Sequence, residues 1–487
     1  MTDERGTTTE AAPHELLRLK SHSGRLALAT TVLGSGIALL DGTIVNVALP
    51  TIGRDLDADL AGLQWVVNAY ALTLAAFILL GGSLGDRFGR RAMYAVGVAG
   101  FGVASVLCAL SPTVEVLVAA RAVQGLCAAL LVPGSLAILQ ASFHRDDRMA
   151  AIGAWTGLLG VASASGPVVG GWLVEQDWRW AFWLNVPLAA VVVALALKFV
   201  PESRNPLASK HIDVVGITLA VVGLAALTYG LTALSDGVSA RAVVVGVVGV
   251  LALGGFAWAE THAKAPMVPP SLFANRVFTT INLVTLLVYA GLSAALLFLV
   301  LFLQTVAGWS ALEAGAATLP LSIIMLFLAR RFGNLAAKST ARPFMIGGTL
   351  VAATGFVLLA VAPRDPSFVL HVLPGISLLG LGLSMTVAPL TGTVLAAAPD
   401  ELAGTASGVN NAVSRTAGLL AIAALPPLVG LGGADYASPD ALAPAYRLAM
   451  LVCAGLLVGG AALTAVGLRS KEPAPCAGTP HLDHAGR

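Results

Sequence analysis

Long hydrophobic runs, separated by short polar segments, repeat along almost the whole chain. A run of about 20 apolar residues is long enough to cross a lipid bilayer as a helix. In lipid a helix satisfies its own backbone hydrogen bonds, so such runs predict helices rather than open strands. We therefore predict an all-α polytopic membrane protein. Its fourteen predicted transmembrane helices lie at about 26–47, 63–82, 92–111, 114–139, 150–174, 181–200, 213–234, 241–259, 279–303, 312–332, 343–362, 368–397, 404–430 and 446–468.

The composition agrees with this pattern. Hydrophobic residues make up 57% of the 487 residues and charged residues only 11%, against about a quarter in soluble domains. The net charge is +2, and basic residues are scattered among loops, which does not predict a nucleic-acid surface. The four cysteines have no paired spacing for a metal site. We expect a lipid bilayer and small solutes as partners, with no metal and no cofactor.

The distribution of Lys and Arg predicts the orientation, because positive loops stay in the cytoplasm. With the N-terminus inside, most basic residues fall in cytoplasmic segments. Both termini are then cytoplasmic, as tails at 1–25 and 469–487. The predicted outer loops hold only Arg54, Arg179, Arg241, Arg364 and Arg447.

A weak internal repeat predicts two related bundles. A turn rich in Gly and Arg occurs at 82–91, and a similar turn occurs at 330–342. Duplicated sets of six helices are typical of transporters. The runs at 213–234 and 241–259 have no counterpart and are predicted to be an inserted hairpin. We expect a 6+2+6 arrangement, with six-helix bundles at 26–200 and 261–468 and the hairpin with its flanking loop at 201–260.

Asp41 is the carboxylate that stands out, because it follows an apolar run that starts at about Leu26. A charged side chain inside a bilayer costs at least a few kcal/mol and usually marks an ion or substrate path. Asp41 is therefore a candidate functional residue. The alternative is that it lies near the membrane surface or caps a broken helix.

Arg121 is predicted to lie at a similar depth in the fourth helix, with Gln124 and Gly125 one turn further on. Both Asp41 and Arg121 are a few residues from the outer ends of their predicted helices. At about 1.5 Å per residue this permits an ion pair, direct or through water. The alternative is that Arg121 extends to the outer membrane surface.

The segment from Gly82 to Arg91 is too rich in Gly and charge for a spanning helix, and we predict a tight cytoplasmic turn. Asp86 can pair with a cation or with the positive end of a helix. The alternative is that the arginines of this turn only keep the loop on the cytoplasmic side of the membrane. The residues of interest are Gly82, Gly85, Asp86, Arg87, Gly89, Arg90 and Arg91.

The fifth predicted helix carries small residues at helical spacing. Such stripes let helix backbones approach closely, and Pro167 should bend the helix. Close packing alone also explains stripes of this kind. Gly153 and Pro167 lie on one face, shared with Gly171, and a neighbouring face carries Gly166 and Gly170.

Together these segments resemble the major facilitator superfamily, and within it the fourteen-helix drug:proton antiporters of the EmrB and QacA type. The similarity covers residues 26–468 and is strongest at 40–50 and 82–91. Residues 121–125 are similar to the proton-coupling motif of the fourth helix. The fifth helix fits the antiporter motif, except that Ala162 stands where the pattern usually has Gly.

The resemblance implies a role for each motif. Asp41 and Arg121 would couple transport to protons, the segment 82–91 would form a cytoplasmic gate, and the fifth helix would carry the antiporter motif. It also implies export of amphipathic drug-like compounds from a bacterial cytoplasmic (inner) membrane, and we expect a monomer.

The energy source is predicted to be a gradient. No Gly-x-x-x-x-Gly-Lys phosphate loop occurs, which argues against ATP hydrolysis. Asp41 is the one carboxylate well inside a predicted span, so it is the candidate proton carrier. A symporter would use the same carboxylate, and we favour antiport because the family that the chain resembles links the fifth-helix motif to antiport. The alternatives are proton symport, a dedicated metabolite exporter of the same fold, and a membrane enzyme or sensor, for which we find no clustered catalytic residues.

Polar or aromatic residues inside the predicted spans are the candidates for lining a substrate cavity. Each of them could equally be a helix-packing contact. The C-terminal half has no carboxylate deep in a span, since Glu313 and Glu401 sit at predicted ends. We therefore expect dications to be poor substrates. The cavity candidates are Trp65, Asn68, Tyr70, Gln124, Gln304 and Asn411.

Overall fold

The structure is a computed structural model that describes residues 16–204, 213–263, 266–399, 402–433 and 435–468. Most of the predicted N-terminal tail, the whole predicted C-terminal tail and the segments 205–212 and 264–265 lie outside the described residues. The described residues form helices joined by turns, with one isolated β-bridge between Leu17 and Phe143. The all-helical prediction is confirmed.

The N-terminal helices follow one another with short turns. Ser21 and Asp59 cap the first two helices with their side chains, which satisfies backbone N–H groups that have no partner within the helix. The predicted run 181–200 is divided at Leu184 into two helices. The helices are α1 (His22–Asp55), α2 (Leu60–Phe88), α3 (Arg90–Ala109), α4 (Val114–Ser142), α5 (Arg145–Gln176), α6 (Trp180–Trp183) and α7 (Asn185–Phe199).

A helical hairpin follows, formed by α8 (Val214–Ala233) and α9 (Ala240–His262). Glycines let the two helices touch: a Cβ on Gly249 would lie 2.8 Å from the Leu227 Cα. One helix from each half contacts the hairpin, because Leu224 of α8 packs with residues of α2 and of α16 (Ala403–Leu428). The hairpin therefore covers part of the seam between the two halves.

The C-terminal helices are less regular than the hydrophobic runs predicted. Two π-helical turns, η2 (Phe302–Val306) and η3 (Phe368–Val372), extend longer helices. The predicted run 312–332 is two helices, because residues 317 and 318 interrupt it. The remaining helices are α10 (Pro270–Ala274), α11 (Arg276–Leu301), α12 (Ala311–Ala316), α13 (Leu319–Lys338), α14 (Ala341–Ala360), α15 (Leu373–Ala396) and α17 (Pro439–Gly467).

Thirteen helical segments in the described part of the chain are long and apolar enough to span a membrane. The predicted segment 404–430 corresponds to α16, which is 26 residues long but is not among these thirteen. Its polar residues Asn410, Asn411 and Arg415 lower its hydropathy. The count of fourteen and the domain boundaries stay predictions.

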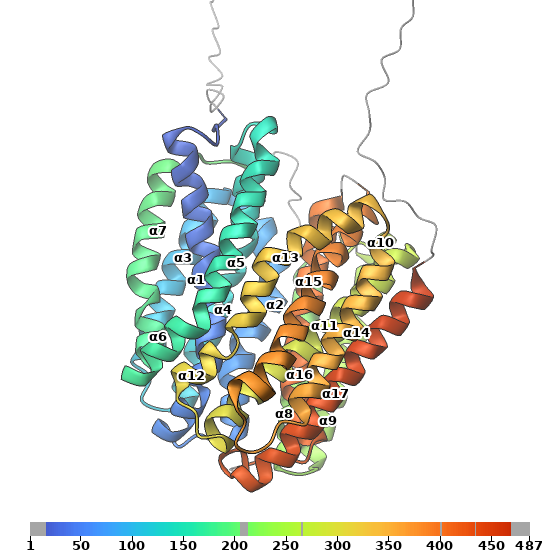
Figure 1. The fold of residues 1–487 in the computed structure, drawn as a ribbon. Helices are drawn as coiled ribbons and strands as arrows, with labels where there is room; N and C mark the ends of the chain where they lie inside the picture. Colours follow the sequence, from blue (N-terminus) through green and yellow to red (C-terminus); the bar gives the residue numbers. More distant parts are fainter. Residues whose placement is uncertain (1–15, 205–212, 264–265, 400–401, 434, 469–487) are drawn as a thin grey trace, which may run out of the picture.

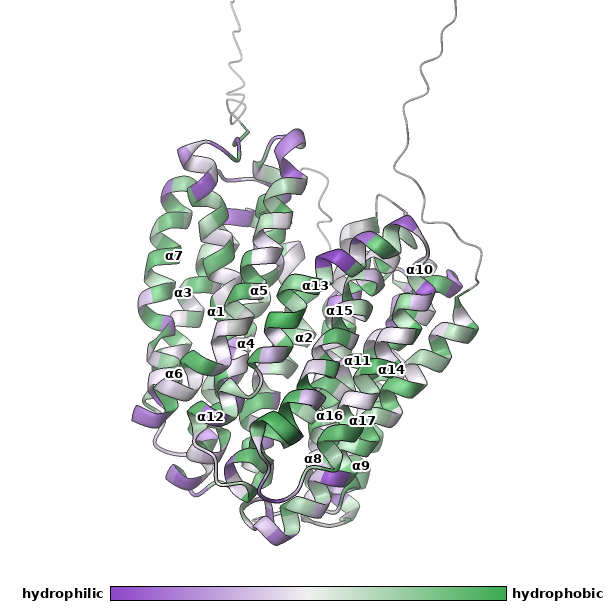
Figure 2. Cartoon of the chain, in the orientation of Figure 1, coloured by the Kyte–Doolittle hydropathy of each residue, from purple (hydrophilic) through white to green (hydrophobic). Residues whose placement is uncertain are grey.

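The helices run side by side in two groups, α1–α7 and α11–α17 (Figure 1). α1 begins and α17 ends at the same end of the molecule, which we name the terminal end; the opposite end is the distal end. The two groups are apart at the terminal end and close together at the distal end (Figure 1). Hydrophobic residues cover the helices and hydrophilic ones gather at the two ends (Figure 2), as expected for a membrane protein.

The prediction of a turn over 82–91 is largely wrong. α2 continues through Phe88, so Gly82, Gly85 and Asp86 are helical, and only Gly89 breaks the helix. Gly89 has a φ of 119°, a conformation that glycine adopts easily and other residues rarely do. The charged residues at this end of α2 do not interrupt the helix. Their low hydropathy means that the segment avoids lipid, and it does not mean that the segment cannot be helical.

Candidate functional site

Asp41 and Arg121 form an ion pair inside the N-terminal group of helices. The Arg121 Nη1 donates to the Asp41 Oδ2 at 2.5 Å, and each residue is 1% exposed. The shared depth predicted from the sequence therefore places the two side chains together. The alternative in which Arg121 extends to the membrane surface does not hold in this structure.

Two amides complete the surroundings of the carboxylate. Gln124 of α4 donates to the Asp41 Oδ1 at 3.0 Å, and Asn185, at the start of α7, donates to the same oxygen at 2.9 Å. Ser105 of α3 accepts from both amides, at 2.9 and 3.3 Å. The buried carboxylate thus joins α1 to α4 and α7, and the two amides extend the network to α3. Burying a carboxylate is tolerated only when its oxygens are hydrogen-bonded in this way.

Arg121 is held from a second side by α2. Its Nε donates to the Val66 carbonyl at 3.1 Å, and its guanidinium lies 4.3 Å from the centre of the Tyr70 ring. Gly125, one turn further along α4, has no room for a side chain because the Tyr70 backbone carbonyl lies against it. The predicted residues Gln124 and Tyr70 therefore belong to this charged cluster.

The segment rich in Gly and Arg at the terminal end of α2 is an ordered junction. Asp86 accepts from its neighbour Arg90 at 2.8 Å. Glu202, just after α7, accepts from the backbone N–H groups of Arg91 and Ala92 at 3.0 and 3.1 Å. Its negative charge thus lies at the N-terminus of α3, where the helix dipole favours it. Arg87 packs its guanidinium over the ring of Phe88.

The two small-residue faces of α5 contact different helices. On the first, Gly166 lies against Thr43 and Gly170 against Ile44, both of α1. On the second, Gly171 meets Leu312 of α12, in the other group of helices, so that a Cβ there would lie 2.5 Å from the Leu312 Cα.

Toward the terminal end the second face makes one further contact, because a Cβ on Gly160 would lie 3.2 Å from the Leu326 side chain of α13. Nothing lies within 4 Å of a Cβ built on Gly153. The α5 stripe is therefore packed against the C-terminal group from Gly171 to Gly160, and it is open at Gly153. Pro167 takes part in this contact, because a Cβ on Gly315 of α12 would meet the Pro167 carbonyl group.

Hydrogen bonds between the two groups lie toward the distal end. Gln304 donates to the Val47 carbonyl at 2.9 Å, and Gln64 to the Ile422 carbonyl at 2.6 Å. The Tyr436 hydroxyl donates to the carbonyl of Ala58 at 2.7 Å. These contacts close the molecule at the end where α1 finishes.

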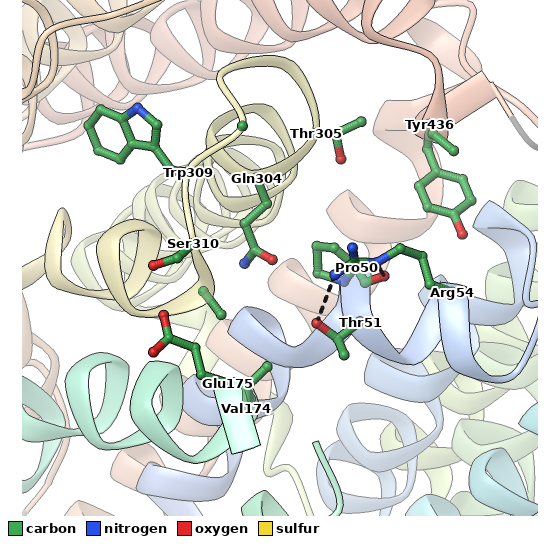
Figure 3. A pocket seen from close by; sticks show the side chains of 13 residues that line it. Pro50, Thr51, Arg54, Val174, Glu175, Gln304, Thr305, Trp309, Ser310 and Tyr436 are labelled. Carbon is green, nitrogen blue, oxygen red and sulfur yellow. Dashed lines mark hydrogen bonds between the residues drawn. The ribbon is translucent and has the colours of Figure 1, made fainter. Parts of the chain in front are cut away.

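A cavity of about 580 Å³ lies beside these contacts (Figure 3). Both groups of helices line it, with Glu175 of α5 on one side and Trp309 and Gln304 on the other. Gln304, a predicted cavity residue, therefore does face a cavity, at the distal end. Arg54 lies across it and donates to Thr51.

The remaining cavity candidates are spread out. Trp65 is half-buried and packs against the cluster of Leu72, Leu224 and Leu419, which favours the packing alternative. Asn68 is fully buried, and neither polar atom of its amide has a partner in the described part of the chain. Asn411 is exposed, whereas its neighbour Asn410 joins α16 to α11 by donating to Thr285 at 2.8 Å.

Sequence reasoning missed Ser105, Asn185 and Glu202. Ser105 contacts Gln124, which is 19 positions away in the chain, and Asn185 contacts Asp41, which is 144 positions away. Glu202 contacts Ala92, which is 110 positions away. Asn185 did carry a signal, since it is a strong hydrogen-bonding group within an apolar predicted span.

Two bundles of membrane-length helices, with a buried ion pair in one and contacts between them at one end, define a two-bundle membrane transporter. The chain matches the Major Facilitator Superfamily over residues 31–423 and belongs to that family. It is 34% identical to the puromycin resistance protein pur8 of Streptomyces alboniger, covering 90% of each chain. It is 33% identical to the tetracenomycin C resistance and export protein of Streptomyces glaucescens, covering 82% of this chain and 75% of that protein.

The fold is also that of solved transporters. The POT family transporter PepTSo superimposes with a TM-score of 0.67, at 16% sequence identity, over 91% of this chain and 97% of that chain. The prediction of a major facilitator fold is confirmed.

The contact between Gly171 and α12 leads to a first prediction. Gly171→Val should force the two groups apart at the distal end, because its Cβ has no space. A Thr305→Cys reporter in the cavity, in a chain without its native cysteines, should then react several-fold faster with a membrane-impermeant maleimide. Gly153→Val is the matched control, since it places the same side chain on the same helix in open space. Equal reaction rates in both variants would contradict the role of this contact.

Proposed function

We propose that this protein is a proton-coupled secondary transporter that exports amphipathic drug-like or antibiotic molecules by alternating access. We infer that it spans a bacterial cytoplasmic membrane with the terminal end in the cytoplasm. The observation that carries the proton coupling is the buried Asp41–Arg121 pair. The names of the relatives support export, because they are resistance and export proteins.

The proton would act on the carboxylate of Asp41. Protonation removes its negative charge, and Arg121 then loses its counter-ion while buried. An unpaired buried cation is unfavourable by several kcal/mol, so the helices that carry Arg121 are driven to rearrange. The Asp41 carboxyl contacts α4 and α7 rather than the C-terminal group. We therefore infer that proton and substrate compete through helix movement rather than at one shared position.

Alternating access would follow from the contacts between the two groups. With the terminal end in the cytoplasm, the structure corresponds to an inward-facing state, in which α5 is packed against α12 at the outer side. In the opposite state the Gly153 end of the stripe would close instead. We also propose that Asp86 then leaves Arg90 and docks at the start of α16, near Gly404, where a Cβ built on the glycine would meet no neighbouring atom within 4 Å.

The proton-coupling role is tested by Asp41→Asn, which keeps the shape of the side chain but cannot ionise. We expect substrate-induced proton release from the detergent-purified protein to fall to background, and transport against a gradient to be lost. Asp55→Asn, on the same helix but half-exposed and paired with Arg179, is the matched control and should retain both. Full proton release and full transport by Asp41→Asn would remove Asp41 from the mechanism.

The proposed docking of Asp86 at the start of α16 predicts that Asp86→Asn shifts the population toward the inward-facing state. An amide binds the positive end of a helix more weakly than a carboxylate does. A Gly404→Cys reporter should be labelled faster in the Asp86→Asn variant than in the chain with Asp86. Asp146→Asn, an exposed acidic residue at the same end, is the control. Unchanged labelling together with lost transport would assign Asp86 a different role.

The charge of the substrate is the third test. Asp41 is the one carboxylate predicted deep in a span, and it already pairs with Arg121. A dication would therefore bury at least one of its charges without a partner, which is costly. In a host without its own pumps, this chain should protect better against monocationic, neutral or zwitterionic members of a dye series than against dicationic members. Equal or stronger protection against the dications would overturn this inference, and no protection against any compound would point to a dedicated metabolite exporter.

A further inference from the structure

Arg415 is a second arginine inside the helical region, and neither the proton mechanism nor the gate uses it. It lies midway along α16 and is half-buried. An arginine at that depth is unfavourable by at least a few kcal/mol unless it faces a partner, a cavity or water. Its surroundings therefore indicate what it binds.

One face of α16 is directed at α2 of the other half. A Cβ on Gly408 would lie 3.0 Å from Leu79, and Leu419 packs in a cluster with Leu72 and Ala76. Arg415 lies on the same helical face, seven residues after Gly408 and four before Leu419. Its Cα is thus on the side of α16 that meets the N-terminal half, between two direct contacts.

A neighbouring face of α16 is directed at α11. Asn410 donates to Thr285 at 2.8 Å, and a Cβ on Gly418 would lie 2.7 Å from the hydroxyl of Ser293. Tyr289 lies between Thr285 and Ser293 on the same face of α11. Arg415 lies three positions before Gly418, at the edge of the α2-facing side that is nearest to this face.

The charges in this region do not balance. No carboxylate lies within ion-pair distance of Arg415 among the residues that the structure describes, whereas Asp41 already pairs with Arg121. The side chains of Asp41, Arg121 and Arg415 together carry one positive charge when Asp41 is ionised and two when it is protonated. The region between the halves is therefore positive in both protonation states.

Asn68 adds unused hydrogen-bonding capacity to the same seam. It lies one turn from Leu72 on the α2 face that meets α16, it is fully buried, and the protein supplies no partner for either atom of its amide in the described part of the chain. Buried amides usually have partners. Water or a bound molecule must supply them.

We propose that Arg415 is a specificity-determining residue that binds an acidic or strongly accepting oxygen of the substrate. The preferred substrates are amphipathic compounds that carry a carboxylate, phenolate or polarised carbonyl, as anions or zwitterions. The planar guanidinium donates to such an oxygen with charge assistance. This inference rests on the proposed export function and narrows its substrates.

The test compares a rhodamine that has a free carboxyl group with its methyl ester, by fluorescence anisotropy on the purified full-length protein. The wild type should bind the free acid at least about tenfold more tightly than the ester, as expected for a charge-assisted hydrogen bond. Arg415→Gln should lose this preference, while binding of the ester changes little. Arg415→Lys should retain part of it, because the charge remains but the fork of donors does not.

Arg364→Gln, which removes an exposed arginine near the distal end, is the control and should keep the wild-type preference. An equal affinity of the wild type for acid and ester, or an unchanged preference in Arg415→Gln, would overturn the proposal. Binding and proton release are separate readouts in this experiment. Loss of dye-induced proton release with the acid preference intact would therefore count against the export mechanism and not against Arg415.

Discussion

The burial of one ion pair in a lipid-embedded bundle constrains much of the N-terminal half. Removing a carboxylate and a guanidinium from water is unfavourable by several kcal/mol for each ion, and their attraction offsets this only with good geometry and further hydrogen bonds. The structure meets that condition, because Gln124 and Asn185 both donate to Asp41 and the Val66 carbonyl accepts from Arg121. Each of these partners comes from α2, α4 or α7, so the pair ties their positions to α1.

The same constraint makes the bundle responsive to a single proton. A neutral Asp41 no longer stabilises Arg121, and packing cannot compensate for a buried, unpaired cation. The glycine faces of α5 give such a rearrangement a route to the other half: Gly166 and Gly170 touch α1, while Gly171 touches α12. A movement of α1 therefore displaces a helix that is in direct contact with the C-terminal group.

The sequence predicted the helices and the ion pair because both depend on local properties. Hydrophobic length defines a span, and counting residues from its end places Asp41 and Arg121 at one depth. Ser105, Asn185 and Glu202 were not predicted, because each acts on a residue brought near only by tertiary packing. The error at 82–91 has another cause.

In that segment composition was taken as evidence for a turn. Helix α2 nevertheless passes through Gly82 and Asp86, and it stops only where Gly89 adopts a positive φ. Glycine content indicates where backbones come close as well as where they turn. The prediction of a cavity residue at Gln304 depended on polarity alone, which does not distinguish a central cavity from one at the distal end.

The placement of the buried charges separates two tasks that a single carboxylate was first expected to perform. Asp41 is enclosed by helices of its own half, whereas Arg415 lies on the face of α16 that meets the other half. Tyr70 lies beside the proton site, since Arg121 packs over its ring, and it belongs to α2, the helix that α16 meets across the seam. A substrate held in the seam would thus act on the proton site through Tyr70 and through α2, without touching Asp41. Coupling by helix position rather than by direct competition tolerates substrates of different shape, because the site that binds them need not fit the proton.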